Sequence, residues 1–242
     1  MIVTKVTKLE PLPLRKAWMN DITQAVAFLE SLNLAHGDLR PENILIDRNQ
    51  LKLSDFDCTA EIGTYFKACM APYGRILNNE EPNEGRRGAS GFLGPRTEQF
   101  ALGSLYYLIN YGFEVYGDRC LTEDPKEHGP KVVELLQNME FPKLDGDPLI
   151  DDVIDKCWHN KYATIAELAA YMETLLPGEA NRKESNAGTI PNPNSEATSP
   201  ERVNTGKPNG WSNDMESHLA DNFSSKKAYC QDLEKRGLLR VL

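Results

Sequence analysis

The stretch "HGDLRPENILID", residues 36–47, decides the predicted fold of this chain. Asp38 and Asn43 stand in a D-x-x-x-x-N relation there, with Arg40 between them. The apolar run "NILI" follows at once, and a second run, "LKLSDF", comes after the turn "DRNQ". Two short apolar runs around a turn predict a β-hairpin. The sequence therefore places a polar loop directly before a hairpin.

A helix is predicted immediately before this loop. In residues 15–33, "RKAWMNDITQAVAFLESLN", the apolar residues Trp18, Ile22 and Val26 recur at helical spacing. Asn33 is a suitable stop for such a helix.

After the hairpin, the chain is expected to be mostly helical. Residues 71–97 are rich in Gly, Pro, Asn and Arg, which predicts a long surface loop. The apolar segment "EQFALGSLYYLINYG" then predicts a buried central helix that stops at Gly112. Three further helices are expected in "GPKVVELLQNM", "PLIDDVIDKCWH" and "TIAELAAYMETLL", and Thr164 with Glu167 gives the last one a capping-box pattern.

These elements predict an α+β fold that is mostly α-helical, with one short β-hairpin. Residues 1–177 have the composition of one folded domain. Residues 178–210 are polar and Pro-rich, which is typical of a disordered linker. Residues 211–242 regain large apolar side chains, and we expect a helical tail.

Composition excludes several classes of function. The net charge of −9, with no basic stripe, argues against binding to nucleic acid. No stretch approaches the roughly 20 apolar residues of a membrane span, and the N-terminus has no leader pattern. Five scattered cysteines without a C-x-x-C pair fit reduced thiols. We therefore expect a protein of the cytoplasm or the nucleus.

The loop also carries the residue types that phosphoryl transfer requires. That reaction needs a carboxylate beside the acceptor hydroxyl, oxygen ligands for Mg²⁺ and a cation near the developing charge. Asp38, Asn43 and Arg40 supply such groups, and Asp55 adds a second carboxylate after the hairpin.

The motifs resemble those of eukaryotic-type protein kinases. "HGDLRPEN" is similar to the catalytic loop of that family and "DFD" to its D-F-G, while "EQFALGSLYYLINYG" and "KCWHNKYATIAEL" resemble two later helical segments. The resemblance implies a protein-kinase-like C-lobe that uses ATP and Mg²⁺. It assigns Asp38 as the catalytic carboxylate, Arg40 as a phosphate contact, Asn43 and Asp55 as metal and nucleotide ligands, and Leu45 as a contact for adenine.

The sequence also departs from the family pattern. Gly37 replaces the arginine that couples the loop to a phosphorylated activation segment, and Asp57 replaces the D-F-G glycine. Glu98 stands where the family has the aspartate that anchors the loop. The A-P-E tripeptide and its arginine partner are missing, the latter replaced around Lys161 and Tyr162. A platform for peptide substrates is therefore in doubt.

Little of the family's N-lobe precedes His36. Only its last strand and hinge could fit, in "MIVTKVTKLEP". We expect this chain alone to bind ATP weakly and to transfer phosphate poorly or not at all. The alternative that the natural product is longer, and active, stays open.

Two other functions remain alternatives to a Ser/Thr protein kinase that acts on a protein substrate. H-G-D and D-F-D also resemble the loops of aminoglycoside and choline phosphotransferases, which favours a small-molecule kinase. A non-catalytic pseudokinase module that binds a partner chain is the third hypothesis. Among the histidines, His36 is expected to be structural, and His128, His159 and His218 are expected at the surface.

Overall fold

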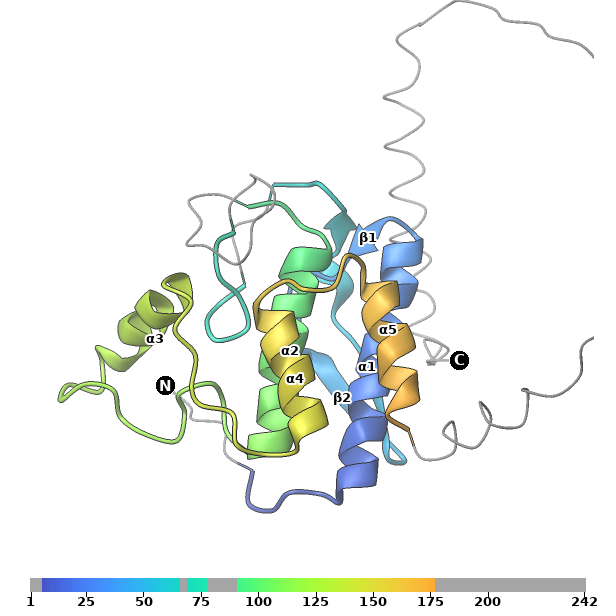
Figure 1. Cartoon of the computed structure of the whole chain (residues 1–242). Coiled ribbons are helices and arrows are strands. Elements are labelled where there is room, and N and C mark those ends of the chain that lie inside the picture. Colours follow the sequence, from blue (N-terminus) through green and yellow to red (C-terminus); the bar gives the residue numbers. More distant parts are fainter. Residues whose placement is uncertain (1–5, 66–68, 78–90, 177–242) are drawn as a thin grey trace, which may run out of the picture.

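The computed structural model of the chain describes residues 6–65, 69–77 and 91–176. Helices and short strands alternate in the first part, and helices dominate the second (Figure 1). The predicted linker and tail, and residues 1–5 of the predicted N-terminal strand, lie outside the described residues. The α-helices in these ranges are α1 Leu12–Ser31, α2 Pro95–Tyr111, α3 His128–Gln137, α4 Pro148–Trp158 and α5 Ile165–Thr174. The strands are β1 Leu34–Ala35, β2 Ile44–Asp47, β3 Gln50–Leu53 and β4 Ala60–Glu61.

The predicted α+β class is confirmed, and so are the helix before the loop and the hairpin after it. β2 and β3 pair antiparallel, from Ile44 opposite Leu53 to Asp47 opposite Gln50. β1 and β4 form a second antiparallel pair on the two sides of the loop and hairpin. Residues 6–11 form no strand, and the backbone N–H of Val6 instead donates to the Gly112 carbonyl.

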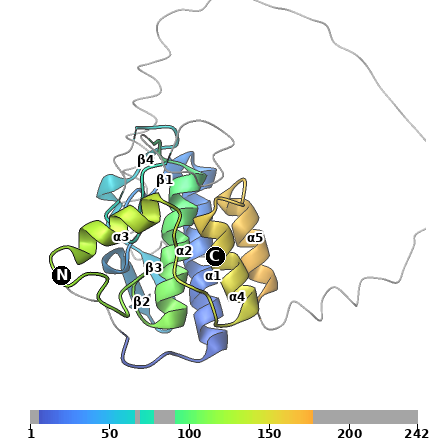
Figure 2. The same ribbon diagram turned by 60° about the vertical axis from the view of Figure 1, so that its left-hand side comes forward.

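Helix α2 is the centre of the molecule, as its apolar sequence predicted. Residues 97–108 are all buried, and α1, α4 and α5 pack around them (Figures 1 and 2). Gly112 ends the helix with φ of 82°, a left-handed conformation that glycine adopts readily. The helix begins at Pro95, three residues earlier than the predicted start at Glu98.

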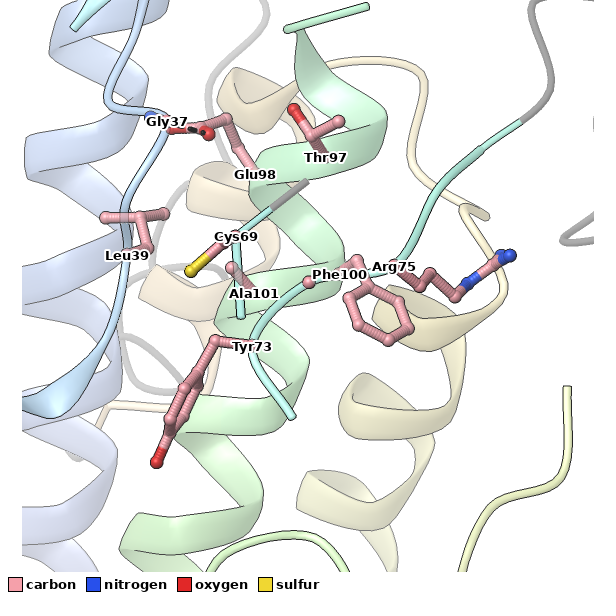
Figure 3. Close-up of a pocket in the computed structure, with 10 residues that line it drawn as sticks. Gly37, Leu39, Cys69, Tyr73, Arg75, Thr97, Glu98, Phe100 and Ala101 are labelled. Atoms are coloured by element: carbon pink, nitrogen blue, oxygen red, sulfur yellow. Dashed lines mark hydrogen bonds between the residues drawn. The ribbon is translucent and has the colours of Figure 1, made fainter. Parts of the chain in front are cut away.

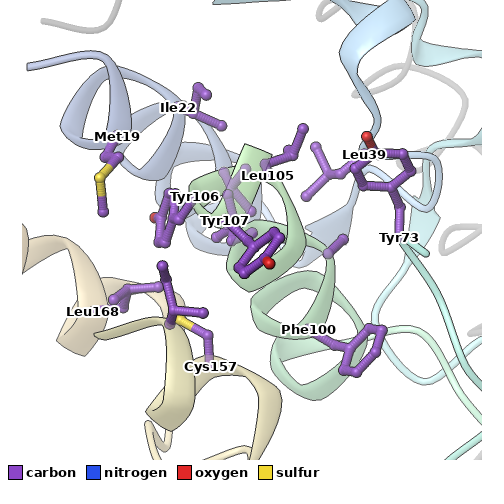
Figure 4. Close-up of a cluster of buried hydrophobic side chains, with 14 of the residues drawn as sticks. Met19, Ile22, Leu39, Tyr73, Phe100, Leu105, Tyr106, Tyr107, Cys157 and Leu168 are labelled. Atoms are coloured by element: carbon purple, nitrogen blue, oxygen red, sulfur yellow. The ribbon is translucent and has the colours of Figure 1, made fainter. Parts of the chain in front are cut away.

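Close packing between α2 and α4 depends on a glycine in the middle of a helix. A Cβ at Gly103 would lie 2.9 Å from Cys157 Cβ and 3.0 Å from Trp158 Cδ1. Trp158 is fully buried and stacks on Phe141, with ring centroids 4.6 Å apart. Figure 4 shows the neighbouring part of the core, with Tyr106 and Tyr107 of α2 among the buried side chains. The helix-destabilising effect of glycine, about 0.5–1 kcal/mol, is thus offset by the indole packed against it.

Helix α5 is fixed at its start by a side chain from the first helix. Glu30 on α1 accepts the backbone N–H groups of Ile165 and Ala166, both at 2.9 Å. Thr164 Oγ1 accepts from Glu167 N–H at 3.0 Å, as the predicted cap requires. Glu167 Oε2 accepts from Ala163 N–H at 2.7 Å, one residue before the cap, because the carboxylate reaches past Thr164.

One surface prediction is wrong. His128 at the start of α3 is buried, with 6% of its surface exposed, because the 117–127 loop folds over it. Its Nδ1 accepts the backbone N–H of Leu121 at 3.3 Å. His159 is partly exposed, and His218 lies outside the described residues. The described cysteines, Cys58, Cys69, Cys120 and Cys157, are free thiols, in agreement with the prediction.

Candidate active site

The loop with the candidate catalytic residues leaves β1 at His36, whose ring is fully buried. The ring Nε2–H donates to the Ser54 carbonyl at 3.0 Å, and Nδ1 accepts the Asp38 N–H at 3.3 Å. Phe56 lies against the ring, with centroids 5.3 Å apart. Burial lowers the pKa of His36, so the ring is neutral. His36 therefore packs beneath the segment that carries Asp55, the structural role predicted for it.

The Asp38 carboxylate is held by three side chains. Asn43 Nδ2 donates to Asp38 Oδ2 at 2.9 Å and to its carbonyl at 2.8 Å. Arg40 Nε lies 3.2 Å from Oδ2, and Cys69 Sγ donates to Oδ1 at 3.2 Å. The Asp38 side chain keeps 18% of its surface exposed. A carboxylate oriented by several partners yet open to solvent is a suitable proton acceptor.

Asn43 and Asp55 both lie at the open end of the hairpin. The Asn43 carbonyl accepts the Ser54 N–H at 2.9 Å, so Asp55 follows directly after the residue bonded to Asn43. Asn43 is buried, whereas Asp55 is exposed. Asp55 has φ of 59°, a left-handed conformation that residues other than glycine seldom adopt and that is common at functional sites.

The donor set of these two residues fits a hard cation. The amide nitrogen of Asn43 donates to Asp38, so its amide oxygen is the atom that could face a cation. Asp55 adds a carboxylate one residue after Ser54, whose N–H donates to the Asn43 carbonyl. Magnesium prefers such oxygen ligands and usually keeps several waters besides one or two protein ligands.

Leu45 lies on β2 two residues beyond Asn43. Its side chain is 54% exposed and that of the next residue, Ile46, 66%. Leu45 is paired with Lys52 across the hairpin. The hairpin thus presents apolar surface to solvent beside the candidate metal ligands.

Glu98 connects the loop to the central helix. Its Oε2 accepts the His36 N–H at 2.8 Å and its Oε1 accepts the Gly37 N–H at 3.3 Å. Figure 3 shows the carboxylate reaching from α2 to Gly37. Burial raises the pKa of Glu98 to about 7, although the two N–H groups oppose this shift. The carboxylate thus has the position that the resemblance assigned to it.

The loop conformation requires the glycine that departs from the family pattern. Gly37 has φ of 79°, and a Cβ there would lie 2.8 Å from the Cys58 carbonyl oxygen. The other departure, Asp57, is exposed in the short 3₁₀ turn Phe56–Cys58 that follows Asp55.

Sequence reasoning missed the segment that closes over Asp38. Cys69 reaches the Asp38 carboxylate from 31 positions away. Burial, followed by the contact with Asp38, raises the pKa of Cys69 to about 12, so it remains a neutral thiol donor. Tyr73 Oη donates to Glu114 Oε1 at 3.0 Å, and Ser104 Oγ donates to the Pro72 carbonyl at 2.7 Å. The first of these bonds ties the segment to the residues that follow α2, and the second ties it to α2 itself. The turn-rich sequence there carried no signal of them.

The fold and this constellation together resemble the C-lobe of a protein kinase. The clearest features are the carboxylate–amide pair before a hairpin, the second carboxylate after it and the buried anchor on the central helix. None of the described helices is long and apolar enough to cross a membrane.

Comparisons with known proteins agree with this class. Residues 4–73 match the family described as protein kinase domain. Over 97 residues the chain is 40% identical to the mitochondrial serine/threonine-protein kinase ppk24 of Schizosaccharomyces pombe, a match that covers 40% of this chain and 16% of the relative. CBL-interacting serine/threonine-protein kinase 20 of Arabidopsis thaliana is 24% identical over 164 residues, 60% of this chain and 36% of the relative. The liver/testis phosphorylase b kinase gamma catalytic chain of Mus musculus is 50% identical over 48 residues, 19% of this chain and 12% of the relative.

Over these regions the chain is similar to eukaryotic-type protein kinases. The matched regions span from 12% to 36% of the length of these three relatives.

Proposed function

We propose that this chain carries the catalytic lobe of an ATP-dependent Ser/Thr protein phosphotransferase. The single observation that carries the proposal is the convergence of three side chains on the Asp38 carboxylate, which is fixed yet open to solvent. A proton acceptor held in one orientation contributes to catalysis because the substrate group meets it already in position. Two of the similar proteins are serine/threonine-protein kinases, which supports serine or threonine as the acceptor residue.

Each residue of the loop takes a separate role in the proposed reaction. Asp38 accepts the proton of the substrate hydroxyl as its oxygen attacks, and Arg40 beside it offsets the negative charge of the transferred group. Asn43 and Asp55 hold Mg²⁺ through one oxygen each. Mg·ATP, when bound, supplies the phosphoryl group. Leu45 presents its exposed side chain to the adenine ring.

Binding and transfer test the proposal separately. Calorimetry should show Mg·ATP binding by the 242-residue chain, weakened at least tenfold in Asp55→Ala and unchanged in Asp152→Ala. Asp152 is a suitable control because it is an exposed carboxylate on α4, paired with Lys156. Phosphate transfer to a peptide mixture should be lost in Asp38→Asn. Transfer that persists in Asp38→Asn would refute the role of the base.

A non-catalytic binding module is the second candidate. Its support is the exposed pair Leu45 and Ile46, since apolar surface on a hairpin favours contact with another chain. Co-purification with a protein that shields these two residues from hydrogen exchange, together with no Mg·ATP binding, would favour this candidate over the first. The small-molecule kinase remains a narrower alternative, supported by Gly37 and Asp57, and ATP consumption with hydroxylated metabolites but not peptides would favour it.

A further inference from the structure

The carboxyl group of Glu98 is buried at the point where the catalytic loop meets α2. Only 4% of the residue surface is exposed. Its carboxyl oxygens accept hydrogen bonds from the backbone N–H groups of His36 and Gly37. These are the two residues directly before Asp38. The protonation state of Glu98 therefore bears on the part of the loop that positions the candidate base.

A carboxylate and a carboxylic acid hold two amides differently. The ionised group offers two acceptor oxygens, one for each N–H. The protonated group keeps one good acceptor, while its hydroxyl oxygen becomes a donor. The two bonds are unequal, 2.8 Å to His36 and 3.3 Å to Gly37. Protonation at Oε1 therefore removes the weaker bond, and the Gly37 amide loses its acceptor.

The surroundings bring this protonation into the neutral range. Burial raises the pKa of Glu98 to about 7, Glu30 on α1 raises it further, and the two loop amides lower it. A small cavity of about 10 Å³ borders the carboxyl group, and Figure 3 shows its lining. The lining includes Cys69 and Tyr73, which are neutral because burial raises the pKa of each, and Arg75, whose pKa burial lowers to about 10, still well above neutral.

The remaining titratable groups near Glu98 do not produce the same transition. His36 faces it from the loop, but burial lowers the pKa of that ring below the ordinary value of 6.5. Arg96 lies two positions earlier on α2 and carries a constant charge near neutral pH. Glu98 is thus the group at this junction whose charge changes around pH 7.

We propose that Glu98 makes the position of the catalytic loop dependent on pH: the ionised carboxylate holds the amides of His36 and Gly37 together, and the protonated group releases Gly37. Glutamate at this position, in place of the family's aspartate, supplies the buried carboxyl group. The consequence for catalysis rests on the proposed function, since a released Gly37 leaves Asp38 less well oriented. Phosphoryl transfer should then fall as the pH drops below about 7.

The test uses a structural readout that does not require activity. The amide resonances of His36 and Gly37 are followed by NMR from pH 5.5 to 8.5, together with the side-chain carboxyl carbon of Glu98. We expect Gly37 and the carboxyl carbon to titrate with one midpoint near pH 7. Hydrogen exchange at Gly37, corrected for its intrinsic pH dependence, should be about tenfold faster at pH 6 than at pH 8, because one charge-assisted bond is lost.

Two variants identify the group responsible. In Glu98→Gln the transition at Gly37 should disappear. Asp21→Asn is the matched control, because Asp21 is a half-buried carboxylate with a raised pKa that accepts the Leu51 N–H at 3.0 Å, away from the catalytic loop. That variant should keep the transition at Gly37.

Several outcomes would overturn the inference. A titration midpoint of the Glu98 carboxyl carbon outside pH 6–8 would overturn it. A Gly37 amide resonance that does not titrate with the same midpoint would also overturn it. A Gly37 transition that survives in Glu98→Gln assigns the effect to another group. If Glu98→Gln does not fold, the wild-type titration alone decides, because the carboxyl carbon reports on Glu98 directly. Absence of Mg·ATP binding at every pH would refute the proposed function and leave the loop transition standing.

Discussion

Replacement of Gly37 by alanine tests whether the catalytic loop requires glycine for two separate reasons. Gly37 has φ of 79°, where an L-residue costs about 1–2 kcal/mol. An added Cβ would also lie 2.8 Å from the Cys58 carbonyl oxygen, which is backbone and cannot rotate away. Relief of such a clash typically costs about 1–3 kcal/mol more. We expect Gly37→Ala to lower the free energy of unfolding by about 2–5 kcal/mol.

Gly63 provides the matched control. It has φ of 92°, but a Cβ there would meet nothing within 4 Å. Gly63→Ala should therefore cost only the backbone part, about 1–2 kcal/mol. Urea denaturation followed by circular dichroism measures both variants against the wild type. Equal losses in the two variants would show that the contact with Cys58 carries no energy and would refute the argument.

Three further predictions concern stability. Glu30→Ala should lower the free energy of unfolding by about 1–2 kcal/mol, because the amides that start α5 lose their acceptor. Urea denaturation measures this change, and an unchanged free energy would show that water replaces the Glu30 carboxylate fully. Gly103→Ala should cost about 1–3 kcal/mol, because its Cβ would overlap Trp158, and a thermal midpoint equal to the wild type would contradict this. Glu98 has a folded pKa of about 7, above its ordinary 4.5, so its contribution to stability is complete below about pH 4.5 and is lost as the pH rises through 7. This loss amounts to about 3 kcal/mol in all. It should be absent in Glu98→Gln when the free energies of unfolding at pH 5 and pH 8 are compared. An equal decline in the wild type and in Glu98→Gln would disprove the prediction.

Ionisation of Glu98 is expected to have opposite effects on the stability of the fold and on the order of the loop. The ionised carboxylate costs stability because it is desolvated, yet in that form it has an acceptor for each loop amide. The fold is thus expected to be more stable at lower pH, while the loop is expected to be better held at higher pH. Stability and loop order can be measured separately in one pH series.

The sequence predicted the elements whose information is local. The apolar spacing of α1 and the continuous apolar run of α2 gave both helices, and the turn residues between β2 and β3 gave the hairpin. Asp38 and Asn43 were found together because five positions and a short turn separate them. Their hydrogen bond, 2.9 Å long, follows from that local geometry.

Contacts between distant segments could not be predicted in the same way. Cys69 reaches Asp38 across 31 positions, and Glu30 reaches Ile165 across 135. Neither residue differs in type or local pattern from an ordinary surface thiol or helix carboxylate. His128 was misassigned for the same reason, since its burial comes from a loop that covers it. Such placements depend on the tertiary packing.

The Glu30 contact also has a consequence for the order in which the chain is made. Glu30 and the start of α5 are 135 positions apart. At a synthesis rate of roughly 5–20 residues per second, α5 is made on the order of ten seconds after α1. The part of α1 that packs against α5 in the folded protein remains uncovered through that interval. Nascent chains of this protein should therefore depend on chaperones until the last described helix has left the ribosome.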